Sequence, residues 1–480
     1  MSGRPGFAAP GSPGDHRWTG RATTWIAFGS AVNGLGAFLF QIVGTRVLGA
    51  EGYAPVGVLW TLQYLWLAVA VTAVEAYVTR LVIVRGHDAA RVRRFLRLLR
   101  RWLLAAALVT TVAAVAAAGP LFSGHASLGV SLGLLVLAYG WYGVVRGRAA
   151  GMDRFRAYAL ATAGESSVRL VAAVAVLAVV ASTPALGWVF PLGPLVVAAW
   201  AWARSHPAAR GASAEARGVP QTDTGRGASA EAHEAGGAGA GPAAAAADDA
   251  SASGPVEPPL ADVAVGEDGR RREATRFLAA TSTANAAVQF LLAGGPLMLV
   301  LLRAGSTAIS VLFTTVTLAR VPMTFALNGG LSRLLPPLTR MAQADDAAGI
   351  RRAAAWIFLA IVAVAGVAAG GAALLGPEVV ELLFGPEFRP QRTMIVVVAA
   401  GTVLAVGGLL LDQLYIATGR QARLPIVWVA AVVVAVALVA WLPGTPTMRV
   451  ASGFALATCG GVVALMIGLL GPAARRPPAG

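Results

Sequence analysis

The sequence is poor in charged residues and in cysteine. Only 13% of its 480 residues are charged, against about 25% in typical soluble domains. It therefore lacks the polar side chains that would cover the surfaces of soluble domains. Cys459 is the only cysteine, which excludes a scaffold of disulfide bonds. Lysine is absent, so all 38 basic residues are arginine. An ordinary soluble enzyme is excluded.

Several catalytic and energy-coupling motifs are also missing. No segment has the GxxxxGKS/T pattern that holds nucleotide phosphates, and no HExxH or Cys/His cluster is present. We therefore expect no metal, no cofactor and no direct use of ATP. The five histidines lie outside the apolar runs, which excludes a buried histidine proton relay. The expected outer loops are short and hold few carboxylates, so a membrane glycosyltransferase is disfavoured and we expect a protein that is not an enzyme.

The sequence is rich in long apolar runs. Hydrophobic residues make up 57% of the chain, and the runs are about 20 residues long, enough for a helix to cross a bilayer. The first run is too long for a signal-peptide core and has no small-residue cleavage site. We predict an all-α, polytopic membrane protein with about twelve transmembrane helices, at residues 22–44, 55–79, 102–120, 128–146, 157–181, 187–203, 277–302, 307–329, 353–376, 393–416, 424–442 and 450–471.

The arginines between these runs predict the orientation. If the N-terminus is cytoplasmic, 31 of the 38 arginines face the cytoplasm, and only Arg46, Arg303, Arg389, Arg392 and Arg449 face outward. Such an excess on the inner side is typical of bacterial plasma-membrane proteins. The net charge of +15 is therefore interpreted as an orientation signal, and nucleic acid is not an expected partner.

One long segment separates the spans into two groups. It is rich in Ala, Gly and Ser and has almost no large apolar side chains, so it cannot bury enough surface to fold alone. The predicted organisation is a disordered cytoplasmic tail at 1–21, a six-helix lobe at 22–203, a disordered cytoplasmic linker at 204–276, a second six-helix lobe at 277–472 and a cytoplasmic tail at 473–480.

Charged residues inside apolar runs are the first candidates for function, because each needs a partner or a wet cavity in the membrane. Glu165 and Arg169 are four residues apart, which places them on one helix face. They form either a structural pair or a pair that holds Arg169 toward a cavity. Arg320 precedes Pro322, and a proline kink beside an arginine suits anion binding; a snorkelling arginine is the alternative.

Other polar residues in the spans give weaker signals. Glu75 and Asp412 are either interfacial anchors or sites that couple transport to an ion, and Glu165 could share that role. Amides that lie in the first helix of each half either pack helices together or line a sugar-binding cavity. The predicted substrate-binding residues are Arg46, Arg169, Arg320, Asn33, Gln41, Asn285 and Gln289.

The segment 91–101 carries six arginines among leucines and phenylalanine. It predicts a basic helix on the cytoplasmic leaflet that attracts anionic membrane lipids.

Four short segments resemble those of a known family, the polysaccharide-flippase branch of the multidrug/oligosaccharidyl-lipid/polysaccharide exporter superfamily. Residues 45–53 (TRVLGAEGY) are similar to its "ARxLGxExYG" turn, although Ala54 stands where glycine is usual. Residues 383–388 (LFGPEF) resemble "LFGxEF", residues 335–340 (LPPLTR) resemble "LPxLSR", and residues 417–420 (ATGR) match the turn after the tenth span. The long linker and the number of spans depart from some relatives.

This resemblance implies two lobes around a central cavity that opens alternately to each side. The implied substrate is a saccharide on a polyprenyl diphosphate, moved from the inner to the outer leaflet, with a polysaccharide polymerase or glycosyltransferases as partners. Ion coupling would be consistent with it. A drug exporter of the same superfamily, a lipid II flippase, a membrane glycosyltransferase and a non-transporting scaffold are the alternatives.

Overall fold

The computed structural model describes residues 15–85, 89–205, 282–321 and 346–471, together with residues 280, 338, 341 and 344. Every regular element in these ranges is a helix. The predicted all-α class is confirmed. The predicted linker and tails lie almost entirely outside the described residues. Helix α1 begins at Asp15, inside the segment predicted as a tail, because extending an existing helix by about two turns costs little.

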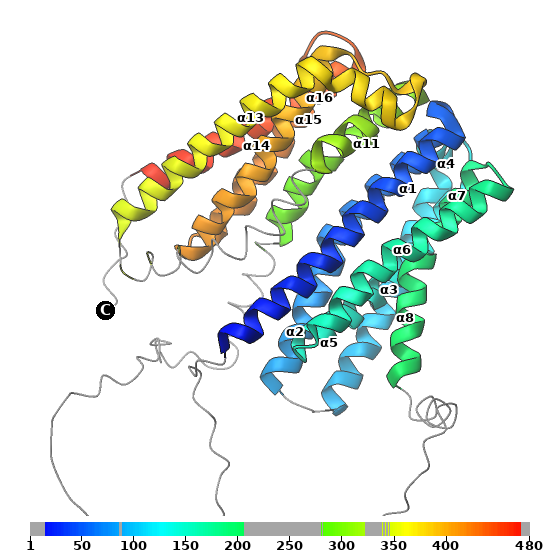
Figure 1. Cartoon of the computed structure of the whole chain (residues 1–480), viewed down its shortest axis with the longest axis vertical. Coiled ribbons are helices and arrows are strands. Elements are labelled where there is room, and N and C mark those ends of the chain that lie inside the picture. The colour runs from blue at the N-terminus through cyan, green and yellow to red at the C-terminus, as the bar shows by residue number, and fades with distance from the viewer. Residues whose placement is uncertain are drawn as a thin grey trace, which may run out of the picture. The chain divides into compact units, whose positions relative to one another are not determined.

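The first half of the chain forms a set of helices that pack on one another (Figure 1). Helix α1 lies along α6, and α5 lies between α2 and α3. The elements are α1 (Asp15–Trp66), the π-helix η1 (Leu67–Val71), α2 (Thr72–Arg85), α3 (Ala89–Ala116), α4 (Ala118–Phe122), α5 (Ala126–Gly151), α6 (Phe155–Val179), α7 (Thr183–Val189) and α8 (Leu192–Ser205).

The second half forms a comparable set. Helix α14 packs against α13 and α16, and α15 packs against α16. The elements are the helix Ser282–Ala293, α11 (Gly295–Leu301), the helix Ser306–Val321, α13 (Ala347–Phe384), the 3-10 helix η2 (Pro386–Phe388), α14 (Arg392–Ala417), the 3-10 helix η3 (Gln421–Arg423), α15 (Leu424–Trp441) and α16 (Pro446–Leu470).

Nine helices in the described ranges are long and apolar enough to cross a membrane, or ten if a bent pair counts as one span. Each predicted span has a helical counterpart. The helical segment Thr24–Thr79 corresponds to the first two predicted spans. They are joined at Gly49, whose φ of 67° and ψ of 179° interrupt the helical backbone. The bent pair is Ser282–Ala293 and Gly295–Leu301, which meet at 70°, and Ser306–Val321 matches the described part of the eighth span.

The outward surfaces of these helices are apolar. On α3, the side chains of Leu104, Leu108, Val109 and Val112 are all exposed, and α13 and α15 carry similar exposed leucines and valines. A patch of this extent is rare on soluble proteins but suits a bilayer, which solvates apolar side chains. Together with the span lengths, it makes this a multi-pass membrane protein.

Candidate functional site

A buried polar network crosses three helices of the first half. On α6, the Arg169 guanidinium lies 3.2 Å from the Glu165 carboxylate, and both side chains are almost fully buried. The pair has the i, i+4 spacing that the sequence predicts. Gly193 of α8 lies directly over it, since an added Cβ there would come within 2.4 Å of the Glu165 carbonyl oxygen.

Tyr139 of α5 connects this pair to α1. Its hydroxyl donates to Glu165 Oε1 at 2.7 Å and accepts from Gln63 Nε2 at 2.7 Å and from Arg169 Nη1 at 3.2 Å. We call these four residues, Gln63, Tyr139, Glu165 and Arg169, the buried network. Each charge has several partners, as a charge inside a membrane protein requires.

Two aromatic rings connect Arg169 to Arg320. The Arg169 Cζ lies 4.7 Å from the centroid of the Trp60 ring. The centroids of Trp60 and Tyr64 are 6.1 Å apart, and the Arg320 Cζ lies 4.7 Å from the Tyr64 centroid. Trp60 and Tyr64 are one turn apart on α1, so both face the same side. We call this series Arg169–Trp60–Tyr64–Arg320 the aromatic bridge.

The Arg320 end of the bridge joins the two halves of the chain. Arg320 Nη2 lies 3.4 Å from Gln289 Oε1. One turn earlier than Gln289, Asn285 donates from Nδ2 to the carbonyl of Ala68 at 3.3 Å. Ala68 belongs to the π-helix η1, a type of helix that frequently occurs at functional sites.

Several buried polar atoms around the bridge have no hydrogen-bond partner among the described residues. They include Arg169 Nε, Trp60 Nε1 and Gln63 Oε1, and also Tyr53 Oη and Gln41 Oε1. Buried polar groups are almost always bonded to protein or to ordered water. Their gathering on α1 and α6 suits a region that accommodates water or a polar ligand.

Glu75 lies in a separate cluster. Its carboxylate pairs with Arg146 Nη2 at 3.2 Å and accepts from the Tyr158 hydroxyl at 2.9 Å. Arg146 also donates to the Tyr158 hydroxyl and lies over the rings of Tyr142 and Tyr158. The sequence predicts only an orientation role for Arg146, because its ion-pair partner Glu75 lies in a distant segment.

Asp412 is a buried carboxylate in the second half. Trp428 Nε1 donates to Oδ1 at 3.0 Å and to Oδ2 at 3.1 Å. Gly408 permits this approach, because an added Cβ there would lie 2.5 Å from the Trp428 ring. In the described part of the chain, Asp412 has no ion-pair partner. An ionised carboxylate held by one neutral donor is costly in a membrane, so Asp412 is a candidate for binding a proton or a cation.

Arg46 belongs to a third region, where the two halves meet. It donates from Nε to the Leu383 carbonyl at 2.9 Å and from Nη2 to the Leu382 carbonyl, both at the end of α13. Ala50 donates its backbone N–H to Glu387 Oε2 at 2.8 Å, and its carbonyl accepts from Ser310 Oγ at 2.5 Å. We call this set of contacts the latch.

Most residues of the latch belong to the "TRVLGAEGY" and "LFGPEF" motifs. Leu382 directly precedes the second motif, and Ser310 lies in the helix Ser306–Val321. Gly49 is required between them, because its φ is positive and an added Cβ would lie 2.9 Å from Glu387 Oε2. The motifs therefore form a contact between the two halves of the chain.

The predicted site residues fall into separate groups. Arg169, Arg320, Asn285 and Gln289 lie at or beside the aromatic bridge. Gln41 is buried. It follows Phe40 in the sequence, and the centroid of the Phe40 ring lies 5.8 Å from the Arg169 Cζ. Asn33 is half-buried. Arg46, Glu75 and Asp412 lie elsewhere, as described above. Pro322 is outside the described residues, so the proposed kink is not described.

Sequence reasoning missed the aromatic residues Trp60 and Tyr64 and the buried Tyr139. The i, i+4 spacing of Trp60 and Tyr64 beside Gln63 was the available signal, but aromatic residues are common in any apolar helix.

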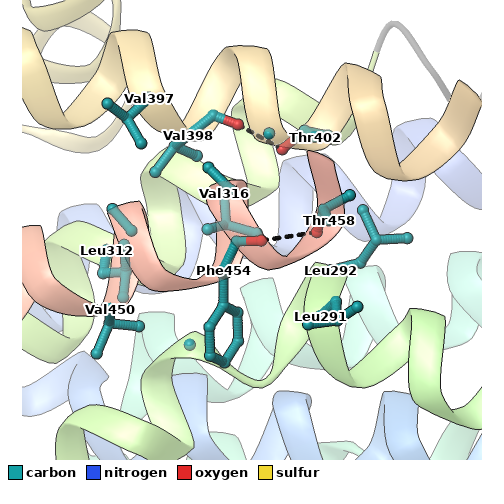
Figure 2. Close-up of a pocket in the computed structure, with 14 residues that line it drawn as sticks. Leu291, Leu292, Leu312, Val316, Val397, Val398, Thr402, Val450, Phe454 and Thr458 are labelled. Carbon is teal, nitrogen blue, oxygen red and sulfur yellow. Dashed lines mark hydrogen bonds between the residues drawn. The ribbon is translucent and has the colours of Figure 1, made fainter. Parts of the chain in front are cut away.

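A small pocket in the second half has a different character. It lies beside the bend at Gly294, between the helices Ser282–Ala293 and Ser306–Val321, α14 and α16. Figure 2 shows its lining of leucines, valines and Phe454. The hydroxyls of Thr402 and Thr458 donate to carbonyls of their own helices, at Val398 and Phe454. Because both hydroxyl protons already take part in hydrogen bonds within their helices, the pocket suits an apolar group. It contains none of the predicted site residues.

Comparisons with known proteins identify the fold. No family model matches the chain, and no curated protein matches it. Among solved structures, it is similar to an inward-facing multidrug resistance MATE family transporter of the MOP superfamily, with a TM-score of 0.59 and 15% identity over 90% of this chain and 92% of that one.

Two further structures have the same architecture. A MATE in the bent conformation matches with a TM-score of 0.53 and 14% identity, over 95% of this chain and 94% of that one. A MOP superfamily transporter from Pyrococcus furiosus Vc1 matches with a TM-score of 0.52 and 15% identity, also over 95% and 94%. At these identities the likeness establishes architecture alone: the chain has the fold of the MATE transporters of the MOP superfamily.

Proposed function

We propose that the protein is a flippase that moves a polyprenyl-diphosphate-linked saccharide from the inner to the outer leaflet of a bacterial plasma membrane by alternating access. The fold supports a transporter, since structures of this architecture include inward-facing and outward-facing conformations. The four sequence motifs support the polysaccharide branch.

The observation that carries the proposal is the aromatic bridge. Arg169 and Arg320 place two permanent positive charges at its ends. Guanidinium groups bind phosphate oxygens with paired hydrogen bonds and stack on aromatic rings. A diphosphate head group matches this chemistry.

Each residue has a defined part in the proposed mechanism. Arg320 is half-buried and contacts both halves of the chain, so it binds the diphosphate. Asn285 and Gln289 lie beside it and bind sugar hydroxyls through their amides. Arg169 is held by Glu165 and Tyr139, and it orients Trp60 and thereby Tyr64. Contacts between the two halves of the chain lie on both membrane sides of the bound head group. The head group crosses as the contacts on one side form while those on the other side break.

The test uses protein in liposomes that contain a fluorescent polyprenyl-diphosphate saccharide. Transfer is measured as the fraction of head groups accessible to a glycosidase on the outer side. Arg320→Gln is expected to reduce the transfer rate at least tenfold, while the control Arg351→Gln/Arg352→Gln, in exposed arginines of α13, leaves it unchanged. Equal rates for wild type and Arg320→Gln would refute the assignment of Arg320.

Asp412 supports a second candidate, an exporter of organic cations. A buried carboxylate without a basic partner in the described residues is suited to a cationic substrate. The solved structures include a multidrug resistance transporter, and the Pyrococcus furiosus transporter is described as having a binding pocket of reverse polarity that suggests a different function. Asp412→Asn tests this second function: efflux of an organic cation by the wild type that is lost in Asp412→Asn, with no saccharide transfer by the wild type, would favour the exporter.

A further inference from the structure

Arginine side chains on α3 border an open groove beside α5. The groove is lined by Leu96, Arg97, Arg100 and Trp141. The two helices approach closely beside it, because Gly140 has no side chain and Leu103 packs into the space, where an added Cβ would come within 2.5 Å of the leucine methyl groups. This packing places Trp141 next to the arginines.

The charge of the groove is entirely positive. Neither α3 nor α5 contains an aspartate or a glutamate. Among the residues that the structure describes, Arg97 and Arg100 form no ion pair or hydrogen bond, and both are exposed. Arg97 and Arg100 are three residues apart on one face, so two guanidinium groups can converge on a single anion.

The position of the groove along the helix matches the edge of a bilayer. From Arg97 to the end of α3 at Ala116, a helix rises about 28 Å, close to the roughly 30 Å of the hydrocarbon core. Leu104 and Leu108 follow Arg100 at intervals of four and are exposed, so the same face continues into the region of the acyl chains. Trp102 and Trp141 are also exposed, as is typical of aromatic residues at the membrane interface.

We infer that this groove binds the phosphate head group of an anionic glycerophospholipid. Arg97 and Arg100 hold the phosphate, Trp141 packs against the glycerol, and the acyl chains lie along Leu104 and Leu108. The site is separate from the aromatic bridge, and the inference does not depend on the proposed substrate. By the distribution of arginines, the bound lipid belongs to the cytoplasmic leaflet.

The test measures phospholipid binding by the full-length protein in detergent, by native mass spectrometry with phosphatidylglycerol or phosphatidylcholine. The wild type is expected to retain phosphatidylglycerol preferentially. Arg97→Gln/Arg100→Gln is expected to weaken phosphatidylglycerol binding about tenfold or more. The control Arg351→Gln/Arg352→Gln removes the same charge from α13 and is expected to bind like the wild type.

Two further arms identify the ligand and the site. Trp141→Leu keeps the charge and is expected to reduce binding less than the double arginine variant does. A polyprenyl phosphate is added in competition. Equal loss of phosphatidylglycerol in the two double arginine variants would overturn the site, because the effect would then be one of total charge. Displacement of phosphatidylglycerol from the groove by a much lower concentration of polyprenyl phosphate would overturn the assignment to a glycerophospholipid.

Discussion

Arg46 on α1 donates hydrogen bonds to the carbonyls of Leu382 and Leu383, although more than 300 residues separate them in sequence. These carbonyls lie in the last turn of α13, where helix carbonyls lack partners within the helix. The positive charge also lies at the negative end of the helix dipole. Arg46 therefore caps the C-terminus of α13, a helix in the other half of the chain. In the proposed transport cycle, this contact breaks when the protein opens on that side.

Loss of the latch is expected to expose the residues beneath it. Thr314, buried one turn from Ser310, is replaced by cysteine in a Cys459→Ser background. Arg46→Ala should raise its labelling by an impermeant maleimide about fivefold, which corresponds to roughly 1 kcal/mol for the lost hydrogen bonds. Arg389→Ala is the control, because Arg389 pairs with Glu378 and Glu381 within its own half. Equal labelling in the two variants would contradict the latch.

The buried network makes a prediction about stability. Glu165→Gln should destabilise the protein by about 3–5 kcal/mol, because it leaves the Arg169 charge buried without its carboxylate. The double variant Glu165→Gln/Arg169→Gln should lose much less than the sum of the single losses. The stability losses of the single and double variants are measured as changes in the free energy of unfolding in detergent. Additive losses would show that the two side chains do not interact.

Tyr64 tests whether the aromatic bridge contributes to transport. Tyr64→Leu removes the ring under Arg320, and a cation–π contact contributes about 0.5–2 kcal/mol. We expect the KM for the lipid-linked saccharide to rise by roughly twofold to thirtyfold. Tyr64→Phe keeps the ring and should transport like the wild type. A fall in transport with Tyr64→Phe as large as with Tyr64→Leu would assign the effect to the hydroxyl instead.

Asp412 and Trp428 are expected to respond unequally to substitution. Asp412→Asn retains an oxygen that accepts from Trp428 and removes a buried charge, so stability should be maintained or increased. Trp428→Phe removes the donor from the carboxylate and should cost about 1–3 kcal/mol. Thermal unfolding of the purified variants measures the difference. A large loss of stability in Asp412→Asn would indicate that the charge has a partner the structure does not describe.

The sequence determined the features that depend on neighbouring residues. The lengths of the apolar runs predicted the spans, since a bilayer requires about 20 residues per helix. The spacing of Glu165 and Arg169 predicted their ion pair, since the pitch of a helix is the same everywhere. The glycine turn at residue 49 followed from the motif that contains it.

Only the tertiary structure decided which helices meet. Arg320 with Tyr64, Arg146 with Glu75, Asp412 with Trp428 and Arg46 with the end of α13 are all pairs from separate helices. In a membrane, almost every helix is apolar on most of its surface, so the hydrophobic pattern does not say which faces pack together. That choice depends on close steric fit, such as Gly408 beneath Trp428 and Gly140 beneath Leu103, and on the satisfaction of buried polar groups.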